Sequence, residues 1–282
     1  MMPAMPLSGT KLALTAGLAA LAILACSRLA RPAPVREAEH LLRVGRLDAA
    51  GNLIDTFLHE HPADAEALRV RFFIWLKDEN NVAALETHRH FPTNSPILPA
   101  ALTYRDPAVR GNVARLIAEN DLPVAAPVLI DSLDDPEPSV RRYGATVLGQ
   151  HREATALKPL FQLLADDVWY VRAAAAEALG RLGNPRAAGW LVQLLNGDDT
   201  NVYWSAAFAL RDVTDESTRS LLLHLMPTAP PARQFALAVA LAKLKDPAAL
   251  GPLNLGSNSS NATVRLVARQ ALEQMDSARR RL

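Results

Sequence analysis

Residues 166–180 spell DDVWYVRAAAAEALG, and variants of this stretch return along the chain every 31 residues. A valine marks the register most clearly, at Val109, Val140, Val171, Val202 and Val264, with Arg233 in the one remaining position. Eight residues later each copy carries a branched aliphatic residue, at Ile117, Leu148, Leu179, Leu210, Leu241 and Leu272. Six copies without a single insertion indicate a chain built from repeated units.

Each copy has the periodicity of a helix pair. The first stripe, counted from the valine, is mostly alanine, which lets neighbouring helices approach closely. A leucine-rich second helix follows, and breakers such as Gly183-Asn184-Pro185 lie between the two. One pair cannot bury both stripes, so the sequence predicts an all-α fold, an alpha-alpha superhelix of six units over 104–282. We expect only five second helices, because the leucine stripe fades at Gly256-Ser257.

The stretch from Val171-Arg172 to Ala178-Leu179-Gly180 resembles the short HEAT-like repeat first described in phycobilisome lyases. The resemblance covers roughly 104–275 and implies a helical solenoid. It also implies that the arginines after the valine pair with the acidic turn of a neighbouring unit. It implies no single function, since similar repeats serve chromophore lyases, DNA glycosylases, hydroxylases and plain scaffolds.

Aspartate pairs precede three of the units, at Asp134-Asp135, Asp166-Asp167 and Asp198-Asp199. An aspartate at a helix N-terminus accepts hydrogen bonds from free backbone N–H groups, so we expect these pairs to cap first helices. At the far end of the array, the fading leucine stripe predicts poor capping. We therefore expect 264–282 to be one place where a partner could bind.

A different helical pattern occupies 34–100. It resembles a tetratricopeptide repeat, because small and apolar residues fall at that family's offsets: Ala38, Leu41, Gly45, Ala50, Ile54 and Pro62. We expect two helices between 36 and 62, with a turn at Gly45-Arg46. A shift of 34 residues reaches Trp75, Ala84 and Pro96, which predicts a second, half-preserved unit.

Two histidine pairs lie at predicted helix ends in this module, at His59/His61 and His88/His90. Histidine at a helix C-terminus interacts favourably with the helix dipole. The spacing of two residues turns the rings to different faces, which does not suit chelation. We therefore predict no metal site.

The N-terminus contains an apolar run of 14 residues, 12–25, preceded by Lys11. This run is shorter than the roughly 20 residues that a membrane span needs. Residues 22–26, AILAC, resemble the lipobox of bacterial lipoproteins. The resemblance implies a lipoprotein signal peptide over 1–25, lipidation of Cys26, which would anchor the chain to the membrane, and a tether over 26–33.

Localisation follows from the same residues. In lipoproteins, a serine after the cysteine, here Ser27, implies transfer to the outer membrane, on the periplasmic side of the bacterial cell envelope. Arg28 and Arg31 follow the apolar run, although the positive-inside tendency favours positive charge before it. An uncleaved inner-membrane anchor therefore remains an alternative.

Charge and composition argue against several function classes. If the chain is cut before Cys26 it carries 29 basic and 29 acidic side chains, so nothing attracts it to nucleic acid. The array's histidines, His151 and His224, are not followed by glutamate, unlike the iron ligands of hydroxylase relatives. No nucleophile motif or phosphate-binding loop is present. We predict no catalytic residue and no cofactor.

Five aromatic residues recur at the start of adjacent first helices: Tyr143, Trp169, Tyr170, Tyr203 and Trp204. Stacking of units would bring them to one edge beside the acidic turns, as a surface for a partner. The alternative is that they pack in the seams between units.

The leading hypothesis is a non-enzymatic envelope lipoprotein that acts as a protein-interaction scaffold for partners in the cell envelope. One alternative is a bilin-lyase-like enzyme or small-ligand binder. A further alternative is a glycan- or peptidoglycan-binding module.

Overall fold

The computed structural model describes residues 31–279, with side chains described to Asp276. Cys26 and the predicted signal peptide lie outside the described residues. The chain divides into two compact units, the first ending at Ile97 and the second beginning at Leu98. Between residues 31 and 279, no helix is both long and apolar enough to cross a membrane.

The first unit contains two helix pairs, whose bounds are α2 (Ala33–Arg43), α3 (Leu47–Glu60), α4 (Ala65–Lys77) and α5 (Asn81–His88). The chain turns between α2 and α3 at Gly45, whose φ of +80° suits glycine. Ala38, Ala50 and Ile54 are fully buried between the helices. The two helices predicted between 36 and 62 are therefore confirmed.

The histidine pairs lie where the sequence placed them. His59 and His88 are in the last turns of α3 and α5. The Nδ1 atom of His90 lies 3.1 Å from the carbonyl oxygen of Glu86. Within the described part of the chain, no group of three or more His, Cys, Asp or Glu side chains could hold a metal ion.

The second unit follows the 31-residue register. Its first helices are α7 (Pro107–Asn120), α9 (Pro138–Gln150), α11 (Trp169–Leu182), α13 (Thr200–Val213), α15 (Pro231–Lys243) and α17 (Ala262–Arg279). Its second helices are α8 (Ala126–Asp131), α10 (Leu157–Gln162), α12 (Ala188–Leu194), α14 (Glu216–Leu225) and α16 (Leu250–Ser257). A short helix, α6 (Ile97–Leu102), lies at the border of the two units. The all-α prediction is confirmed over residues 31–279, as are the six first and five second helices.

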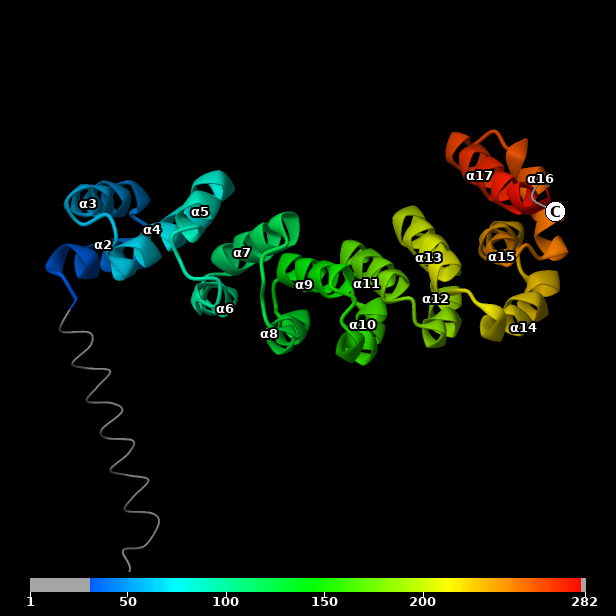
Figure 1. The fold of residues 1–282 in the computed structure, drawn as a ribbon, viewed down its shortest axis with the longest axis horizontal. Helices are drawn as coiled ribbons and strands as arrows, with labels where there is room; N and C mark the ends of the chain where they lie inside the picture. Colours follow the sequence, from blue (N-terminus) through cyan, green and yellow to red (C-terminus); the bar gives the residue numbers. More distant parts are fainter. Residues whose placement is uncertain (1–30, 280–282) are drawn as a thin grey trace, which may run out of the picture. The chain divides into compact units, whose positions relative to one another are not determined.

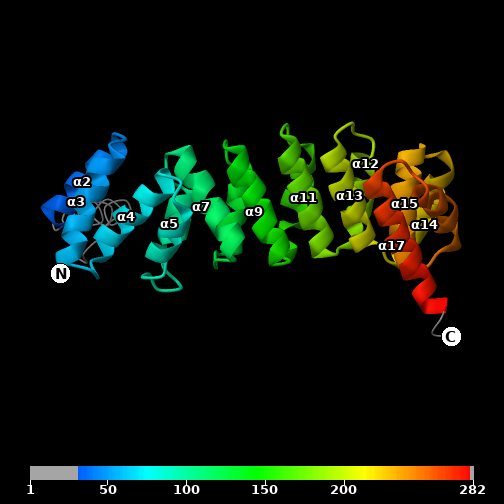
Figure 2. The same cartoon turned by 90° about the horizontal axis from the view of Figure 1, so that it is seen from above.

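The helices of the second unit form two layers. Figure 2 shows α7, α9, α11 and α13 side by side as one row. Figure 1 shows α8, α10, α12 and α14 beneath that row. Short 3₁₀ turns such as Ser132–Asp134 and Leu163–Ala165 extend the second helices toward the next unit. One face of the first-helix row is therefore free of the second layer.

Close approach within the row depends on alanine and glycine. A Cβ atom added to Gly149 would lie 2.6 Å from the Cα of Ala178. One added to Gly180 would lie 2.7 Å from the Cα of Ala209. Two carbon atoms cannot approach so closely, since their optimal separation is about 3.5–4.0 Å. The glycine of the Ala-Leu-Gly signature is therefore the position at which one first helix touches the backbone of the next.

Arginine–aspartate pairs link successive units. Arg141 Nε and Nη2 donate to the two carboxylate oxygens of Asp166 at 2.7 and 2.9 Å, and Nη1 donates to the Asp135 carbonyl oxygen at 2.8 Å. Arg110 binds the Asp135 carboxylate in the same way, at 2.7 and 3.0 Å. This two-pronged geometry is the strong form of the ion pair. The expected pairing with a neighbouring acidic turn is confirmed.

The acidic turns are less simple than predicted. Asp199 caps α13 by accepting from the N–H groups of Asn201 and Val202. The expectation that the other two pairs cap helices is wrong, because Glu137 caps α9 and Val168 holds the N-cap position of α11. Asp135 and Asp166 instead accept from the N–H groups of these N-cap residues, Glu137 and Val168, at 2.8 and 2.9 Å, and they also pair with arginines.

The Asp166 pair is sensitive to acid. Burial alone would raise the pKa of the Asp166 carboxyl, but hydrogen bonds from Arg141 and from the N–H of Val168 hold that pKa below its ordinary value of 3.8. Because the pKa is depressed in the folded state, the pair stabilises the fold above pH 3.8 and loses this contribution as the pH falls below that value.

The series of pairs is interrupted at the third arginine. Arg172 Nη1 donates to the carbonyl oxygens of Asp166 and Asp167 at 2.7 and 3.1 Å. The residue 25 positions after Arg172, where Asp135 and Asp166 stand in earlier units, is Gly197. In the described structure no carboxylate pairs with Arg172. The junction between α11 and α13 therefore lacks this ion pair.

The end of the array carries exposed charged residues. Arg269 of α17 stands where earlier units have a buried alanine, and Arg269, Glu273 and Asp276 are all exposed. Leu266 of the same helix is 58% exposed. The expected poor capping of this end, and with it a partner site over 264–282, stays a prediction.

Restoring the missing aspartate should stabilise the second unit. A Cβ atom at Gly197 would meet only the Leu194 carbonyl oxygen, at 3.5 Å, so a side chain fits. We expect Gly197→Asp to pair with Arg172 and raise the free energy of unfolding by about 1 kcal/mol, measured by urea denaturation. Gly197→Asn is the control, since it has the same shape without the charge. Equal stabilisation by both variants would contradict an ion pair.

Candidate functional site

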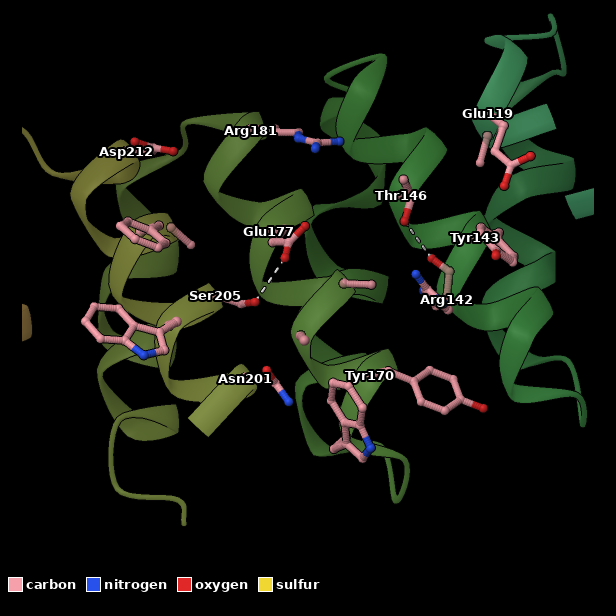
Figure 3. A pocket seen from close by; sticks show the side chains of 17 residues that line it. Glu119, Arg142, Tyr143, Thr146, Tyr170, Glu177, Arg181, Asn201, Ser205 and Asp212 are labelled. Carbon is pink, nitrogen blue, oxygen red and sulfur yellow. Dashed lines mark hydrogen bonds between the residues drawn. The ribbon is translucent and has the colours of Figure 1, made fainter. Parts of the chain in front are cut away.

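A hollow of about 840 Å³ lies on the free face of the first-helix row. Side chains of four successive first helices, α7, α9, α11 and α13, line it (Figure 3). The larger lining residues are Glu119, Arg142, Tyr143, Trp169, Tyr170, Glu177, Arg181, Asn201, Trp204, Phe208 and Asp212. The volume is within the range of ligand-binding pockets.

The hollow exists because α11 carries small residues where its neighbours carry larger ones. Ala173 and Ala174 form its floor. One period earlier the same positions hold Arg142 and Tyr143, and one period later they hold Trp204 and the small Ser205. The larger side chains of α9 and α13 therefore rise on either side of an alanine floor.

Aromatic rings gather toward the start of the helices. Trp169 meets Tyr170 edge to face at 5.6 Å between ring centroids and remains 43% exposed. Trp204 stacks on Phe208 at 5.7 Å and meets Phe235 edge to face at 6.3 Å. Trp204 is thus fixed by packing, whereas Trp169 offers a free ring surface.

The guanidinium of Arg142 already lies on two of these rings. Its Cζ atom is 4.9 Å from the ring centroid of Tyr143 and 5.9 Å from that of Tyr170. A cation over an aromatic face is attracted by the ring's quadrupole. The hollow therefore already contains cation–π contacts, formed by the protein's own Arg142.

The charged groups have separate positions. Glu177 accepts a hydrogen bond from Ser205 Oγ at 3.0 Å, beside the alanine floor. Figure 3 shows Glu119, Arg181 and Asp212 at the end of the hollow away from Tyr170 and Asn201. Asp212 pairs with Arg211 at 2.8 Å. The hollow thus has an aromatic end at the helix N-termini and a charged end at the C-termini.

Four of the five predicted aromatic residues line the hollow, namely Tyr143, Trp169, Tyr170 and Trp204. The fifth, Tyr203, lies in the seam with the next unit, where its hydroxyl donates to the Ala232 carbonyl oxygen at 2.6 Å. Burial raises the pKa of Tyr203 to about 12. For Tyr203, the alternative prediction of packing in the seam between units is therefore the correct one.

Sequence reasoning missed the polar lining, including Glu119, Arg142, Glu177 and Arg181. A signal was present. Aligning the units by their period shows Ala173 where both neighbouring units have a large side chain, Arg142 and Trp204. Small residues on the exposed face of a helix leave a recess. The larger side chains at the equivalent positions of neighbouring helices form its walls.

The side chains of the hollow suit binding by stacking, ion pairing and hydrogen bonding. Neither histidine nor cysteine is among the residues that line it. The one hydroxyl–carboxylate pair, Ser205 and Glu177, has no third group to orient it as a nucleophile and base would require.

The two-layer array of helix pairs defines an α-solenoid. The family model described as HEAT repeats matches residues 126–211 and 189–273, which together exceed half of the chain. The chain belongs to the HEAT-repeat family. No curated protein matches it.

Solved structures with similar architecture were also found. The complex of CpcE and CpcF of phycocyanin lyase from Nostoc sp. PCC7120 is 24% identical over 64% of this chain and 77% of that chain, with a TM-score of 0.49. A designed armadillo repeat protein is 19% identical over 64% and 99%, with a TM-score of 0.44. Human deoxyhypusine hydroxylase is 20% identical over 79% and 99%, with a TM-score of 0.34.

The seam position of Tyr203 can be separated from the hollow by mutation. Tyr203→Phe removes the hydrogen bond to Ala232 and should lower the free energy of unfolding by about 1 kcal/mol in urea denaturation. Tyr170→Phe is the control, because no hydrogen bond of the Tyr170 hydroxyl occurs in the described structure. A larger loss from Tyr170→Phe than from Tyr203→Phe would contradict this assignment.

Proposed function

We propose that the protein is a non-enzymatic scaffold that binds a partner protein in the hollow of α7, α9, α11 and α13. The observation that carries this proposal is the free ring of Trp169 beside the alanine floor. Exposed tryptophans next to a recess are the side chains that most often dominate the energy of a protein interface. Membership of the HEAT-repeat family supports the proposal, because stacked helix pairs present extended binding surfaces.

The partner is proposed to be a protein of the cell envelope, and nucleic acid is not an expected ligand. The hollow contains both carboxylates and guanidinium groups, including Glu119, Glu177 and Arg142. A surface that binds phosphates would instead be dominated by basic residues.

Removing the Trp169 ring tests the scaffold function. We expect Trp169→Ala to weaken capture of the partner by at least about tenfold, since a central tryptophan contributes about 2 kcal/mol or more to an interface. Capture would be measured by affinity purification from envelope extract, followed by titration of the purified partner.

Phe161→Ala is the matched control. Phe161 is 38% exposed, close to the value for Trp169, but lies on α10 in the other layer and stacks on Trp190. Partner binding should survive this change. If both variants bind as well as wild type, the hollow is not the interface.

A second candidate function is a small-ligand binder or bilin-lyase-like enzyme. The volume of about 840 Å³ and the aromatic lining favour it, because planar ligands stack on such rings. It predicts a coloured or ultraviolet-absorbing compound that purifies with the protein and is lost in Ala174→Tyr. The glycan- or peptidoglycan-binding alternative predicts that Trp169→Ala abolishes binding to cell-wall material.

We also propose that the protein is a lipoprotein anchored through Cys26 on the periplasmic side of the outer membrane. The lipobox-like residues before Cys26 support this location. Cys26→Ser should release the protein from the membrane fraction and abolish incorporation of labelled palmitate. If the variant stays in the inner-membrane fraction, the alternative of an uncleaved anchor replaces this proposal.

A further inference from the structure

We infer that the hollow binds an extended segment of the partner that carries lysine or arginine side chains. This inference rests on the proposed scaffold function and specifies the chemistry of its ligand. Three features support it: the length of the hollow, the cation already bound within it, and the excess of carboxylates at its aromatic end.

The length of the hollow suits an extended chain. It is lined by four successive first helices, which makes three steps from α7 to α13. Packed helices lie 8–10 Å apart, so the hollow is roughly 24–30 Å long, and about eight extended residues would cover it. An occupant that crosses the helices would place alternate side chains toward the alanine floor.

Arg142 shows which side chain the rings accept. Its guanidinium lies over Tyr143 and Tyr170 on the α9 side of the hollow. No corresponding cation lies on Trp169 within the described structure, although this ring is the most exposed of the four. A lysine or arginine of the partner would find an equivalent aromatic surface there.

The charges at the aromatic end favour a basic ligand. The turns before α11 and α13 carry four carboxylates, at Asp166, Asp167, Asp198 and Asp199, against the guanidinium groups of Arg141, Arg142 and Arg172. One negative charge is therefore in excess at this end of the hollow. This local excess attracts cations even though the whole chain is nearly neutral.

Two of these carboxylates are available to a ligand. Asp166 is occupied by Arg141, and Asp199 caps α13. The carboxylates of Asp167 and Asp198 are exposed, and neither forms an ion pair in the part of the chain that the structure describes. Glu177 adds a third exposed carboxylate beside the alanine floor, where it faces Ser205. Glu177 lines the hollow itself, while Asp167 and Asp198 lie in the turns that precede α11 and α13.

A charge-reversal experiment tests the inference. The probe is a bead-displayed library of random octapeptides, and the protein is the full chain purified in detergent. Wild type should enrich lysine and arginine several-fold over aspartate and glutamate. The triple variant Asp167→Lys, Asp198→Lys, Glu177→Lys should reverse this preference, because the same positions would then attract carboxylates.

The control variant reverses three exposed carboxylates on α14 and α17, outside the hollow and outside the turns before α11 and α13: Glu216→Lys, Glu273→Lys and Asp276→Lys. It has the same net charge as the triple variant and should keep the wild-type preference. Circular dichroism melting checks that both variants are folded. If the control variant and the triple variant change the preference equally, the effect comes from net charge and the inference fails.

Failure of this inference can be distinguished from failure of the proposed scaffold function. If Trp169→Ala loses the partner while the library shows no preference for basic residues, the scaffold function stands and a basic ligand is excluded. Enrichment of acidic residues by wild type, or binding of cell-wall saccharide in place of peptide, would also overturn the inference. If neither partner nor peptide binding depends on Trp169, both proposals fail.

Discussion

The first helices of the second unit approach one another across surfaces made of alanine and glycine, and their order in the row depends on this closeness. At Gly149 and Gly180 the neighbouring backbone lies where a side chain would otherwise be. Larger residues would separate the helices and shift every later unit, because each unit is placed only by its neighbours. Stability then comes from buried apolar surface, while the arginine–aspartate pairs fix how one unit is oriented on the next.

A row held together in this way leaves its free face open to variation. Residues that face the seam must be small, whereas those that face solvent can differ from unit to unit without disturbing the packing. The second unit uses this freedom at α11, where Ala173 stands in place of Arg142 of α9 and Trp204 of α13. The proposed binding surface therefore lies where one repeat differs in sequence from its neighbours. The backbone arrangement beneath it is the one that all repeats share.

Sequence periodicity predicted the helices, because burial repeats with the chain's period, and the resemblance to HEAT-like repeats predicted the linking arginines. It could not place the acidic turns correctly: Asp135, Asp166 and Glu137 can all accept backbone N–H groups, and only geometry decides which of them an arginine reaches. It also grouped Tyr203 with Trp204. Neighbouring helical residues are turned by roughly 100°, so one ring enters the seam while the other lines the hollow.

The interruption of the arginine–aspartate series at Gly197 makes the junctions of the array chemically unequal. A kosmotropic salt such as sulfate strengthens apolar association and screens part-buried charge pairs only partly. The junctions of α7 with α9 and of α9 with α11 contain both kinds of interaction. The junction of α11 with α13 has apolar contact and the Ser205–Glu177 hydrogen bond, but not this ion pair. Ionic strength therefore changes the relative strength of adjacent junctions, and it does so beneath the hollow.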